Sequence, residues 1–423
     1  MLDRRNAPAA YPVEKVLFPS PSLHTLSNGI QVWVVSAGEQ EVFKFELSTK
    51  AGAIHSPLAG LAGMTASLMK RGTATHTAQQ IHQDFDFFGA FWDVQASLDH
   101  GTFTVYGLNK HFNSLLPLVA EILQEASFPA EEVEKELEIE RQKTKLNWEK
   151  TSYAASQKFR SNLFPSDPYG RFTVASDFDA LDQQVIKAHF EGTWKSQKPV
   201  IFLSGKISEA QIAYLDATLG QINFNSPAIS IPTLQTAKEP IRLREEKEGS
   251  VQSSIRFGLP AISRNHPDYF HYSVMNTVLG GYFGSRLQKN IREDKGFTYG
   301  VSSSLAPYPR GGYWVVGTDV ANANVQETCD EIRKEMLRLS SEKVGQDELE
   351  LVKNYLMGSF TGELTQAFDI AEKIKVIQLE NLPLDFYDQF QAQILACTSE
   401  DLLELANKYL DPTNLHEVIV GGR

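Results

Sequence analysis

The ten histidines are the residues whose metal chemistry is easiest to detect from spacing alone. A zinc hydrolase site on a helix needs two histidines four residues apart, so that both imidazoles project from one face, and a glutamate that deprotonates the metal-bound water. The closest pairs, His76 with His82 and His266 with His271, have spacings that point to different faces. Asp268 shares a helical face with His271, but metal binding needs more ligands, and we interpret these two as polar surface residues. The histidine spacing therefore predicts no helical zinc site.

Motifs for nucleotide, serine and thiol chemistry are also missing. Neither Gly-x-Gly-x-x-Gly after a strand nor Gly-x-x-x-x-Gly-Lys-Ser/Thr occurs, and there is no Gly-x-Ser-x-Gly elbow. Ser302, Ser303 and Ser304 are interpreted as strand and loop hydroxyls. Cys329 and Cys397 form no Cys-x-x-Cys pair, allow at most one disulfide, and are expected to be small buried thiols.

Strand and helix patterns alternate through the first half of the chain. Alternating apolar and polar residues or a short apolar run predict strands, and apolar residues at every third or fourth position predict helices. The predicted strands are a hairpin at 23–36 that turns at Asn28-Gly29, and further strands at 43–50, 103–108 and 200–204. The predicted helices are a buried one at 60–70, one at 111–126, and a long charged one from Pro129 to about Phe159.

The second half repeats this order of elements. Residues 225–240 show no hydrophobic periodicity and contain several prolines, and a dense run of charged residues follows them. This stretch is therefore the best candidate for a domain boundary. The elements predicted beyond it are a strand at 253–259, a helix at 267–279, a glycine-rich corner, a helix to Lys295, and paired strands at 299–304 and 312–319. We predict an N-terminal arm at 1–20, a first domain at 21–225, a linker at 226–250 and a similar second domain at 251–423.

Composition limits the partners that the chain can have. Forty basic against 52 acidic residues give a net charge of -12, which repels nucleic acid and anionic lipid, so we expect neither as a partner. No window approaches the roughly 20 uninterrupted apolar residues of a membrane span, and the first residues lack the apolar stretch of a secretory signal. We expect a cytoplasmic location, or a periplasmic one if a leader has been removed.

The segment 285–301, SRLQKNIREDKGFTYGV, resembles the most recognisable stretch in the C-terminal domain of the insulinase/pitrilysin metallopeptidases, which include mitochondrial processing peptidase. In the first half, LSNGIQV at 26–32 is similar to the family's opening strand. The segments GLA at 60–62 and KRGT at 70–73 are similar to the ends of its first core helix, and Pro168-Tyr169-Gly170 to a later corner. The resemblance covers nearly the whole chain from about Pro21. It implies an α+β fold in which each domain is a mostly antiparallel sheet packed against helices, and the two domains together make half of a clamshell.

The zinc motif of the family is replaced in this chain. Where the family carries His-x-x-Glu-His, the sequence reads Gly63-Met-Thr-Ala66-Ser67, so both histidines and the general base are absent. By resemblance the third ligand, a glutamate, falls near residues 142–144, and none of these is Glu; Glu140 is close but would be alone. Zinc needs about four donors and one open position to activate water. We therefore expect no metal or other cofactor in this chain, and zinc in a partner subunit.

A second constellation of the family, an Arg and a Tyr in the C-terminal domain, is present as Arg292 and Tyr299. Arg292 lies near a predicted helix end, Gly296 supplies the left-handed cap and Tyr299 begins the next strand, so both side chains are expected to reach one cleft. There they would grip the peptide carbonyl and the oxyanion formed from it. From spacing alone the pair would be interpreted as structural, and the resemblance favours the catalytic role.

By resemblance, the chain is similar to the zinc-free subunit of a heterodimeric zinc endopeptidase that closes around unfolded peptides. The expected partners are a homologous subunit with His-x-x-Glu-His and an extended peptide that adds to a sheet edge, for which the strand at 91–97 is the candidate. Trp92 in that strand is expected to be a half-buried aromatic. The main alternative is a noncatalytic peptide-binding or scaffolding relative. A homodimer with an unrecognised metal site is a third possibility, which the histidine spacings disfavour.

Overall fold

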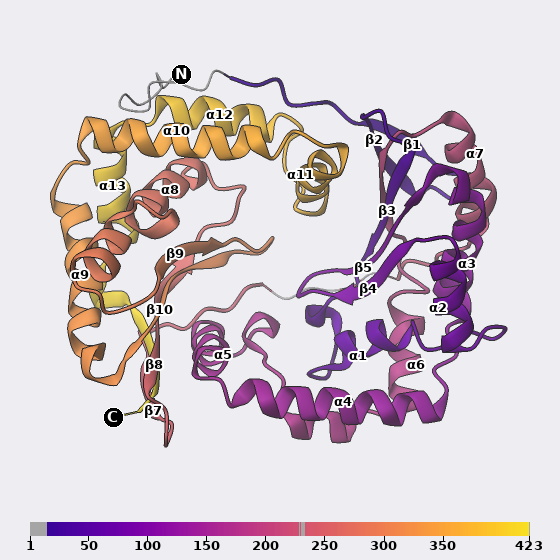
Figure 1. Ribbon diagram of the computed structural model, residues 1–423, viewed down its shortest axis with the longest axis horizontal. Helices are drawn as coiled ribbons and strands as arrows, with labels where there is room; N and C mark the ends of the chain where they lie inside the picture. The colour runs from indigo at the N-terminus through magenta and orange to yellow at the C-terminus, as the bar shows by residue number, and fades with distance from the viewer. Residues whose placement is uncertain (1–14, 228, 230–232, 423) are drawn as a thin grey trace, which may run out of the picture.

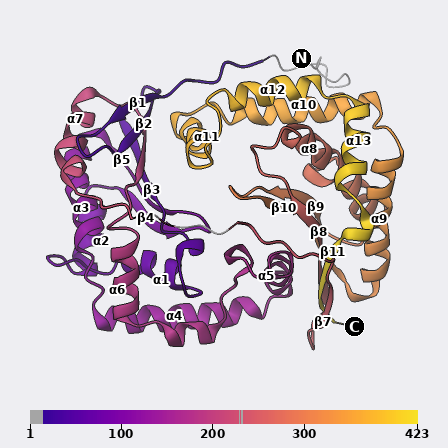
Figure 2. The same cartoon turned by 180° about the vertical axis from the view of Figure 1, so that it is seen from behind.

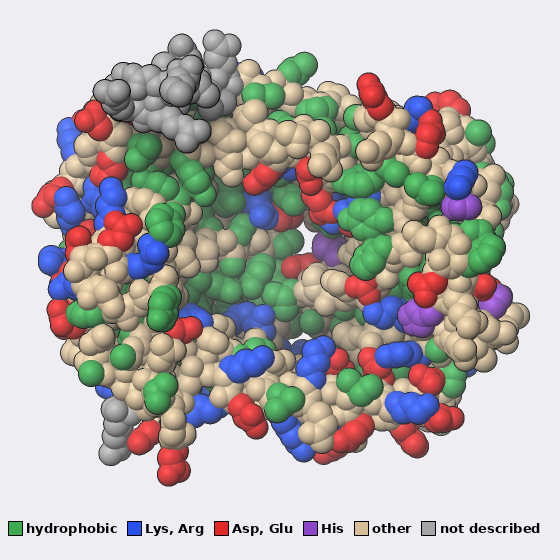
Figure 3. All heavy atoms as spheres, viewed as in Figure 1, with side chains coloured by type: hydrophobic (Ala, Val, Ile, Leu, Met, Phe, Trp, Pro, Cys, Tyr) green, Lys and Arg blue, Asp and Glu red, His purple; other side chains and the backbone are tan. Residues whose placement is uncertain are grey.

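The structure, a computed structural model, describes residues 15–227, 229 and 233–422, and contains two domains that face each other across a central hollow (Figure 1). Each domain has one sheet, with helices on its outer side. Figure 3 shows hydrophobic side chains gathered inside the hollow. Most of the predicted N-terminal arm, residues 1–14, lies outside the described part. This shape is the one expected for half of a clamshell.

The two sheets share one strand topology. The first is built from β1 (Ser22–Thr25), β2 (Gln31–Ser36), β3 (Val42–Thr49), β4 (Phe91–Ala96), β5 (Gly101–Leu108) and β6 (Val200–Gly205), in the order β1-β2-β6-β3-β5-β4. The second is built from β7 (Arg242–Glu246), β8 (Gln252–Ala261), β9 (Val301–Ala306), β10 (Gly312–Ala321) and β11 (His416–Gly421), in the order β7-β11-β8-β10-β9. When β1 is left out, the first, fifth, second, fourth and third strands of each domain lie side by side in that order in both sheets. Only β2 with β6 and β7 with β11 pair in parallel among the described strands, so both sheets are mostly antiparallel, as predicted.

The helices pack outside the sheets, with one exchanged helix in each domain. The N-terminal set is α1 (Leu61–Leu68), α2 (Ala78–Phe87), α3 (Phe112–Glu125), α4 (Ala130–Trp148), α5 (Thr151–Leu163), α6 (Gln183–Gly192) and α7 (Glu209–Thr218). The C-terminal set is α8 (Tyr269–Asn276), α9 (Val325–Ser341), α10 (Gln346–Gly362), α11 (Ala367–Leu379), α12 (Phe386–Ala396) and α13 (Ser399–Tyr409). Helix α5 packs on β8 and β11 of the second sheet, whereas α11 packs on β2 and β6 of the first. Figures 1 and 2 show both exchanges.

The exchanged helices give the two domains shared hydrophobic cores. Ile370 and Ile374 of α11 are buried with Trp33 and Phe202 of the first sheet. Phe159 of α5 is buried against the second sheet, where Gly258 permits its close approach: a Cβ there would lie 2.6 Å from the Phe159 ring. Burying apolar area between the domains stabilises their relative placement at about 25 cal/mol per Å². The domains are therefore joined by packing as well as by the linker.

Two predicted elements differ from the structure. The helix predicted from Pro129 to about Phe159 is broken between Trp148 and Thr151 into α4 and α5, because α5 turns away to reach the other domain. The charge run at 242–248, interpreted as part of the linker, contains β7, an edge strand whose side chains alternate between exposed and half-buried positions. Of the predicted linker, residues 228 and 230–232 lie outside the described residues. Within the described residues, no helix is both long and apolar enough to cross a membrane.

His189 on α6 makes the stability of the first domain sensitive to acid. The side chain is buried, its Nε2 has no hydrogen-bond partner among the described residues, and burial lowers its pKa to about 4. The unfolded chain, with a histidine pKa near 6.5, then binds more protons than the folded chain between pH 6.5 and 4. Stability therefore falls as the pH falls through this window, by about 2 kcal/mol from this residue at pH 5.

We expect His189→Gln to reduce the loss of urea-unfolding free energy between pH 7.5 and pH 5 by about that amount. The measurement is the pH dependence of the difference between wild type and variant, which cancels the carboxylates that titrate in both. A difference that stays constant with pH would contradict the assignment.

Candidate functional site

Helix α1 lies at the position where the sequence predicts the replaced zinc motif. It follows β3, packs against β4, α4 and α6, and buries most of its residues. Gly60 precedes it with φ 77°, a left-handed conformation that glycine adopts at little cost. Gly63, Ala66 and Ser67 lie on this short helix. The predicted buried helix at 60–70 is thus confirmed.

A pocket of about 470 Å³ opens beside α1. It is lined by residues from both segments that the sequence comparison assigned to the family's zinc site. Gly63 and Ser67 line it from α1, and Glu140 and Thr144 line it from α4. Residues 94–96 of β4 form another part of its wall. The structure therefore brings the motif segment, one residue of the 142–144 range and the predicted edge strand to one place.

The side chains of this pocket do not fit a zinc ion. Ser67 Oγ donates a hydrogen bond to Glu136, whose other oxygen lies 2.7 Å from the guanidinium of Arg71. Glu140, the remaining acid near the predicted third position, pairs with the ammonium of Lys143 at 2.8 Å. Both carboxylates are thus engaged by cations. Among the described residues, no cluster of three metal-ligating side chains includes a residue of this pocket. The donor set lacks what zinc requires.

Arg292 contacts Tyr299 through the backbone carbonyl of Tyr299 and not through its side chain. A helical segment at Gln288–Asp294 carries Arg292, and Gly296 ends the segment with φ 66°, the left-handed cap expected from the sequence. Arg292 Nε donates to the backbone oxygen of Tyr299 at 3.0 Å, and its guanidinium lies 4.4 Å from the centre of the Phe283 ring. Tyr299 precedes β9 by two residues instead of beginning it. Arg292 thereby fixes the loop from which Tyr299 projects.

The Tyr299 side chain is 96% exposed and lines a second pocket, of about 430 Å³, on the C-terminal sheet. Arg256, Asp319 and residues of β9 complete this pocket; Arg292 is not among its lining residues. An aromatic ring gains by burial, so nearly complete exposure is not explained by stability. The position suits a phenol that acts on something outside this chain.

Arg256 is a site residue that sequence reasoning missed. It lies in the middle of β8 between buried Ile255 and Phe257, and its Nε donates to Ser156 Oγ of α5 at 3.0 Å. Burial lowers the pKa of its guanidinium, while the charge of Asp319 acts in the opposite direction. The sequence did offer a signal for it, because a charged residue inside an otherwise apolar strand predicts that one face of the sheet is not hydrophobic core.

Both pockets adjoin the free edge of a sheet. Strand β4 is the last strand of the first sheet and β9 the last of the second, and each pairs with one neighbour only among the described strands. The edge predicted at 91–97 is thus confirmed as β4. Trp92 in β4 is half-buried, as expected, and stacks on Phe85 with 4.5 Å between ring centres. Unpaired backbone groups on such an edge can bind an extended peptide.

Comparisons with known proteins agree with the fold. Residues 32–176 match the family model described as insulinase (peptidase family M16), and residues 180–356 match the model described as peptidase M16 inactive domain. A Bacillus subtilis protein named uncharacterized zinc protease YmxG is 22% identical over 356 residues, which cover 82% of this chain and 81% of that protein. A Helicobacter pylori protein named non-peptidase homolog YmxG is 22% identical over 381 residues, which cover 86% of this chain and 85% of that protein.

Among solved structures, a peptidase M16 inactive domain protein from Pseudomonas fluorescens has a TM-score of 0.87 at 24% identity. The match covers 95% of this chain and 98% of that one. The likeness confirms the predicted α+β fold with two tandem domains.

Proposed function

Because the chain belongs to the insulinase (peptidase M16) family, we propose that it is the zinc-free subunit of a two-chain zinc endopeptidase that degrades unfolded peptides. The supporting observation is the contrast between its two pockets. The pocket beside α1 lacks a zinc donor set, whereas Tyr299 beside the other pocket is almost fully exposed. The metal, which activates the attacking water in such enzymes, would lie on a homologous partner with His-x-x-Glu-His.

Tyr299 would act on the substrate as a hydrogen-bond donor. Its phenol extends from a loop that Arg292 holds through the Tyr299 carbonyl, so the donor is placed before substrate arrives. Donors placed in advance stabilise the oxyanion that forms when water attacks a peptide carbonyl. Arg292 has two roles in this proposal: it positions Tyr299, and its terminal nitrogens supply positive charge near the reacting group.

The substrate class follows from the sheet edges. An extended peptide that pairs with β4 or β9 gains backbone hydrogen bonds that do not depend on its sequence. A folded substrate does not offer such a free strand. We therefore propose unfolded peptides as the substrates, bound through main-chain contacts.

A noncatalytic peptide-binding or scaffolding role is the second candidate. It is favoured by the Helicobacter pylori relative, which is named as a non-peptidase homolog. This role would need the sheet edges but not the exposed phenol of Tyr299. A neighbouring gene that encodes His-x-x-Glu-His would favour the two-chain enzyme over this alternative.

The test is to mix this chain with a homologous chain that carries His-x-x-Glu-His and to follow cleavage of a fluorogenic unstructured peptide. We expect neither chain to cleave alone and the mixture to cleave, with both chains eluting together from size exclusion. Cleavage by the isolated chain would overturn the proposal. Stable association without cleavage would establish the scaffolding alternative instead.

A further inference from the structure

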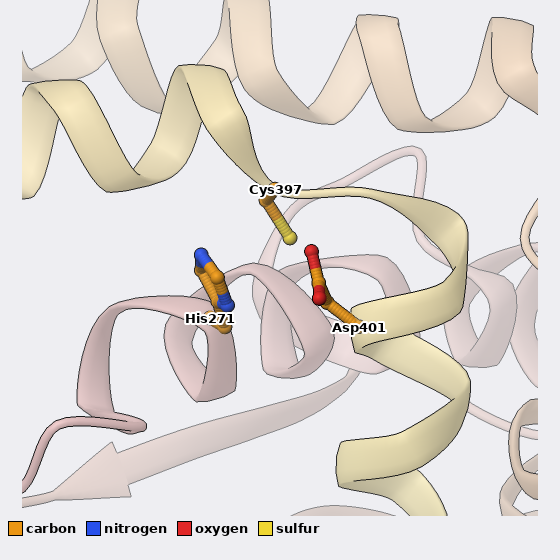
Figure 4. Close-up of side chains that lie close together, drawn as sticks. All are labelled: His271, Cys397 and Asp401. Atoms are coloured by element: carbon orange, nitrogen blue, oxygen red, sulfur yellow. The ribbon is translucent and has the colours of Figure 1, made fainter.

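Three side chains with metal-binding atoms converge at a place outside the lining of both pockets. His271 lies on α8, Cys397 follows the end of α12, and Asp401 lies in the first turn of α13 (Figure 4). One potential ligand atom from each residue lies within 4.8 Å of the others. Sequence spacing gave His271 only Asp268 as a neighbour, and the structure shows that Asp268 bonds instead to Lys408 and Tyr409.

Two of the three side chains are oriented by a hydrogen bond that leaves a ligand atom available, and the Cys397 thiol donates to the Thr398 backbone oxygen at 3.8 Å. His271 Nε2 lies 3.2 Å from the backbone oxygen of Gln393; as the donor to that carbonyl, it leaves the lone pair of Nδ1 for a metal ion. Asp401 accepts the Thr398 backbone N–H at 2.8 Å and its hydroxyl at 2.7 Å with one oxygen, Oδ2, so Oδ1 remains. An outer hydrogen bond of this kind is typical of ligands to bound metal ions.

The chemistry of the three groups selects the ion. Thiolate, imidazole and carboxylate together form a borderline-soft set that suits zinc, whereas calcium and magnesium prefer oxygen ligands alone. With bond lengths of about 2.0–2.3 Å, tetrahedral zinc ligands lie about 3.5 Å apart, so small side-chain rotations would close the cluster. Loss of the thiol proton would give the thiolate and carboxylate a combined charge that neutralises the ion.

The burial of Cys397 argues against the other function that such a cluster could have, which is a catalytic cysteine activated by a histidine. Cys397 is only 1% exposed, so a substrate cannot reach its sulfur for attack. His271 and Asp401 are half-buried, so part of each side chain remains open to solvent, from which a small ion and a water molecule as fourth ligand can reach it. A cation can therefore enter where a peptide cannot.

We propose that His271, Cys397 and Asp401 bind a zinc ion that fastens the α12–α13 corner to α8. The expectation of a chain without metal came from the replaced zinc motif and from histidine spacings along the sequence, and we revise it for this position because the three ligands come from separate elements. The site does not depend on the proposed peptidase function. Its expected effect is structural: α8 is followed along the chain by the segment that carries Arg292 and Tyr299.

The test is metal uptake by the full chain after chelator treatment and dialysis at neutral pH. We expect one zinc ion per chain, and with Co²⁺ a near-ultraviolet absorption band from thiolate-to-metal charge transfer. Ligand removal in His271→Ala or Cys397→Ala is expected to weaken zinc binding at least about 100-fold, as a lost ligand costs more than a lost outer-shell partner. Cys397→Ala should also remove the cobalt band.

Two matched controls separate this site from others. Cys329→Ala removes the other buried thiol of the same domain, and Ser67→Ala alters the pocket beside α1; both should keep full zinc uptake. If the buried Cys397→Ala variant fails to fold, the half-exposed His271→Ala variant decides the question. No zinc uptake by the wild type, or equal uptake by His271→Ala, would overturn the proposal. Neither result bears on peptide cleavage by the two-chain mixture.

Discussion

Replacing Arg310 by alanine is expected to lower the free energy of unfolding by about 3–5 kcal/mol, because it leaves a buried carboxylate without its cation. Asp167 has a fully buried side chain in the first domain, and Arg310 reaches it from the turn between β9 and β10 of the second. The guanidinium makes two hydrogen bonds, of 2.9 and 2.7 Å, to the two carboxylate oxygens. It also lies 4.3 Å from the centre of the Tyr169 ring.

The effect is large because few other groups can replace the lost charge. Tyr169 donates its hydroxyl to Asp99 at 2.6 Å, so it does not turn to solvate Asp167. Its backbone N–H already bonds Asp167 at 2.9 Å. An ionised carboxylate in such surroundings costs several kcal/mol unless a cation balances it.

Urea and thermal unfolding of Arg310→Ala, Asp167→Asn and the double variant measure this contact. The double variant should be more stable than the sum of the single losses predicts, with a coupling of about 0.5–3 kcal/mol, because the uncompensated charge is then gone. Lys135→Ala breaks an exposed ion pair with Glu131 on α4 and should leave stability unchanged within error. A loss below about 1 kcal/mol for Arg310→Ala would contradict a charge-balancing role.

The Asp167–Arg310 contact shows what the sequence could and could not predict. The segment Pro168-Tyr169-Gly170 was recognised as a family corner, but its docking onto the other domain depends on a residue more than a hundred positions away. Strands β2, β3, β5 and β6 were predictable because alternation, or a short apolar run in β6, is a local property of the sequence. The break between α4 and α5 was not, because Glu149 and Lys150 are good helix formers and tertiary packing decides there.

The candidate sites show the same limit. Gly63, Ser67 and Thr144 were linked through the family resemblance, and the structure does place them in one pocket. His271 and Cys397 lie on elements that local patterns cannot bring together, so only the fold reveals their proximity. Spacing arguments detect ligands on one helix and miss ligands that three elements share.

Tyr299→Phe in the two-chain mixture is the second large expected effect, a fall in kcat of about 100- to 1000-fold. The substitution removes one hydroxyl and keeps the ring. Because Tyr299 is 96% exposed, no packing or buried hydrogen bond changes, and the melting temperature should stay the same. KM should change little, since the hydroxyl is proposed to act on charge that develops in the transition state and not on the bound peptide.

A separate variant distinguishes the role of Tyr299 as hydrogen-bond donor from the role of Arg292 in positioning it. Arg292→Lys keeps a positive charge but loses the Nε contact with the Tyr299 carbonyl and the stacking on Phe283. We expect kcat to fall in this variant as well. The double variant with Tyr299→Phe should lower kcat by less than the product of the two single effects, because positioning the loop no longer matters once the Tyr299 hydroxyl is absent.

Tyr355→Phe is the matched control, since Tyr355 is another exposed tyrosine, on α10 and outside the Tyr299 pocket. It should leave kcat and KM unchanged. Full activity of the mixture with Tyr299→Phe would remove this chain from the chemistry and leave it the role of holding substrate or partner. A rise in KM at unchanged kcat would instead place the Tyr299 hydroxyl on the bound peptide, because an interaction lost equally from ground and transition states changes affinity alone.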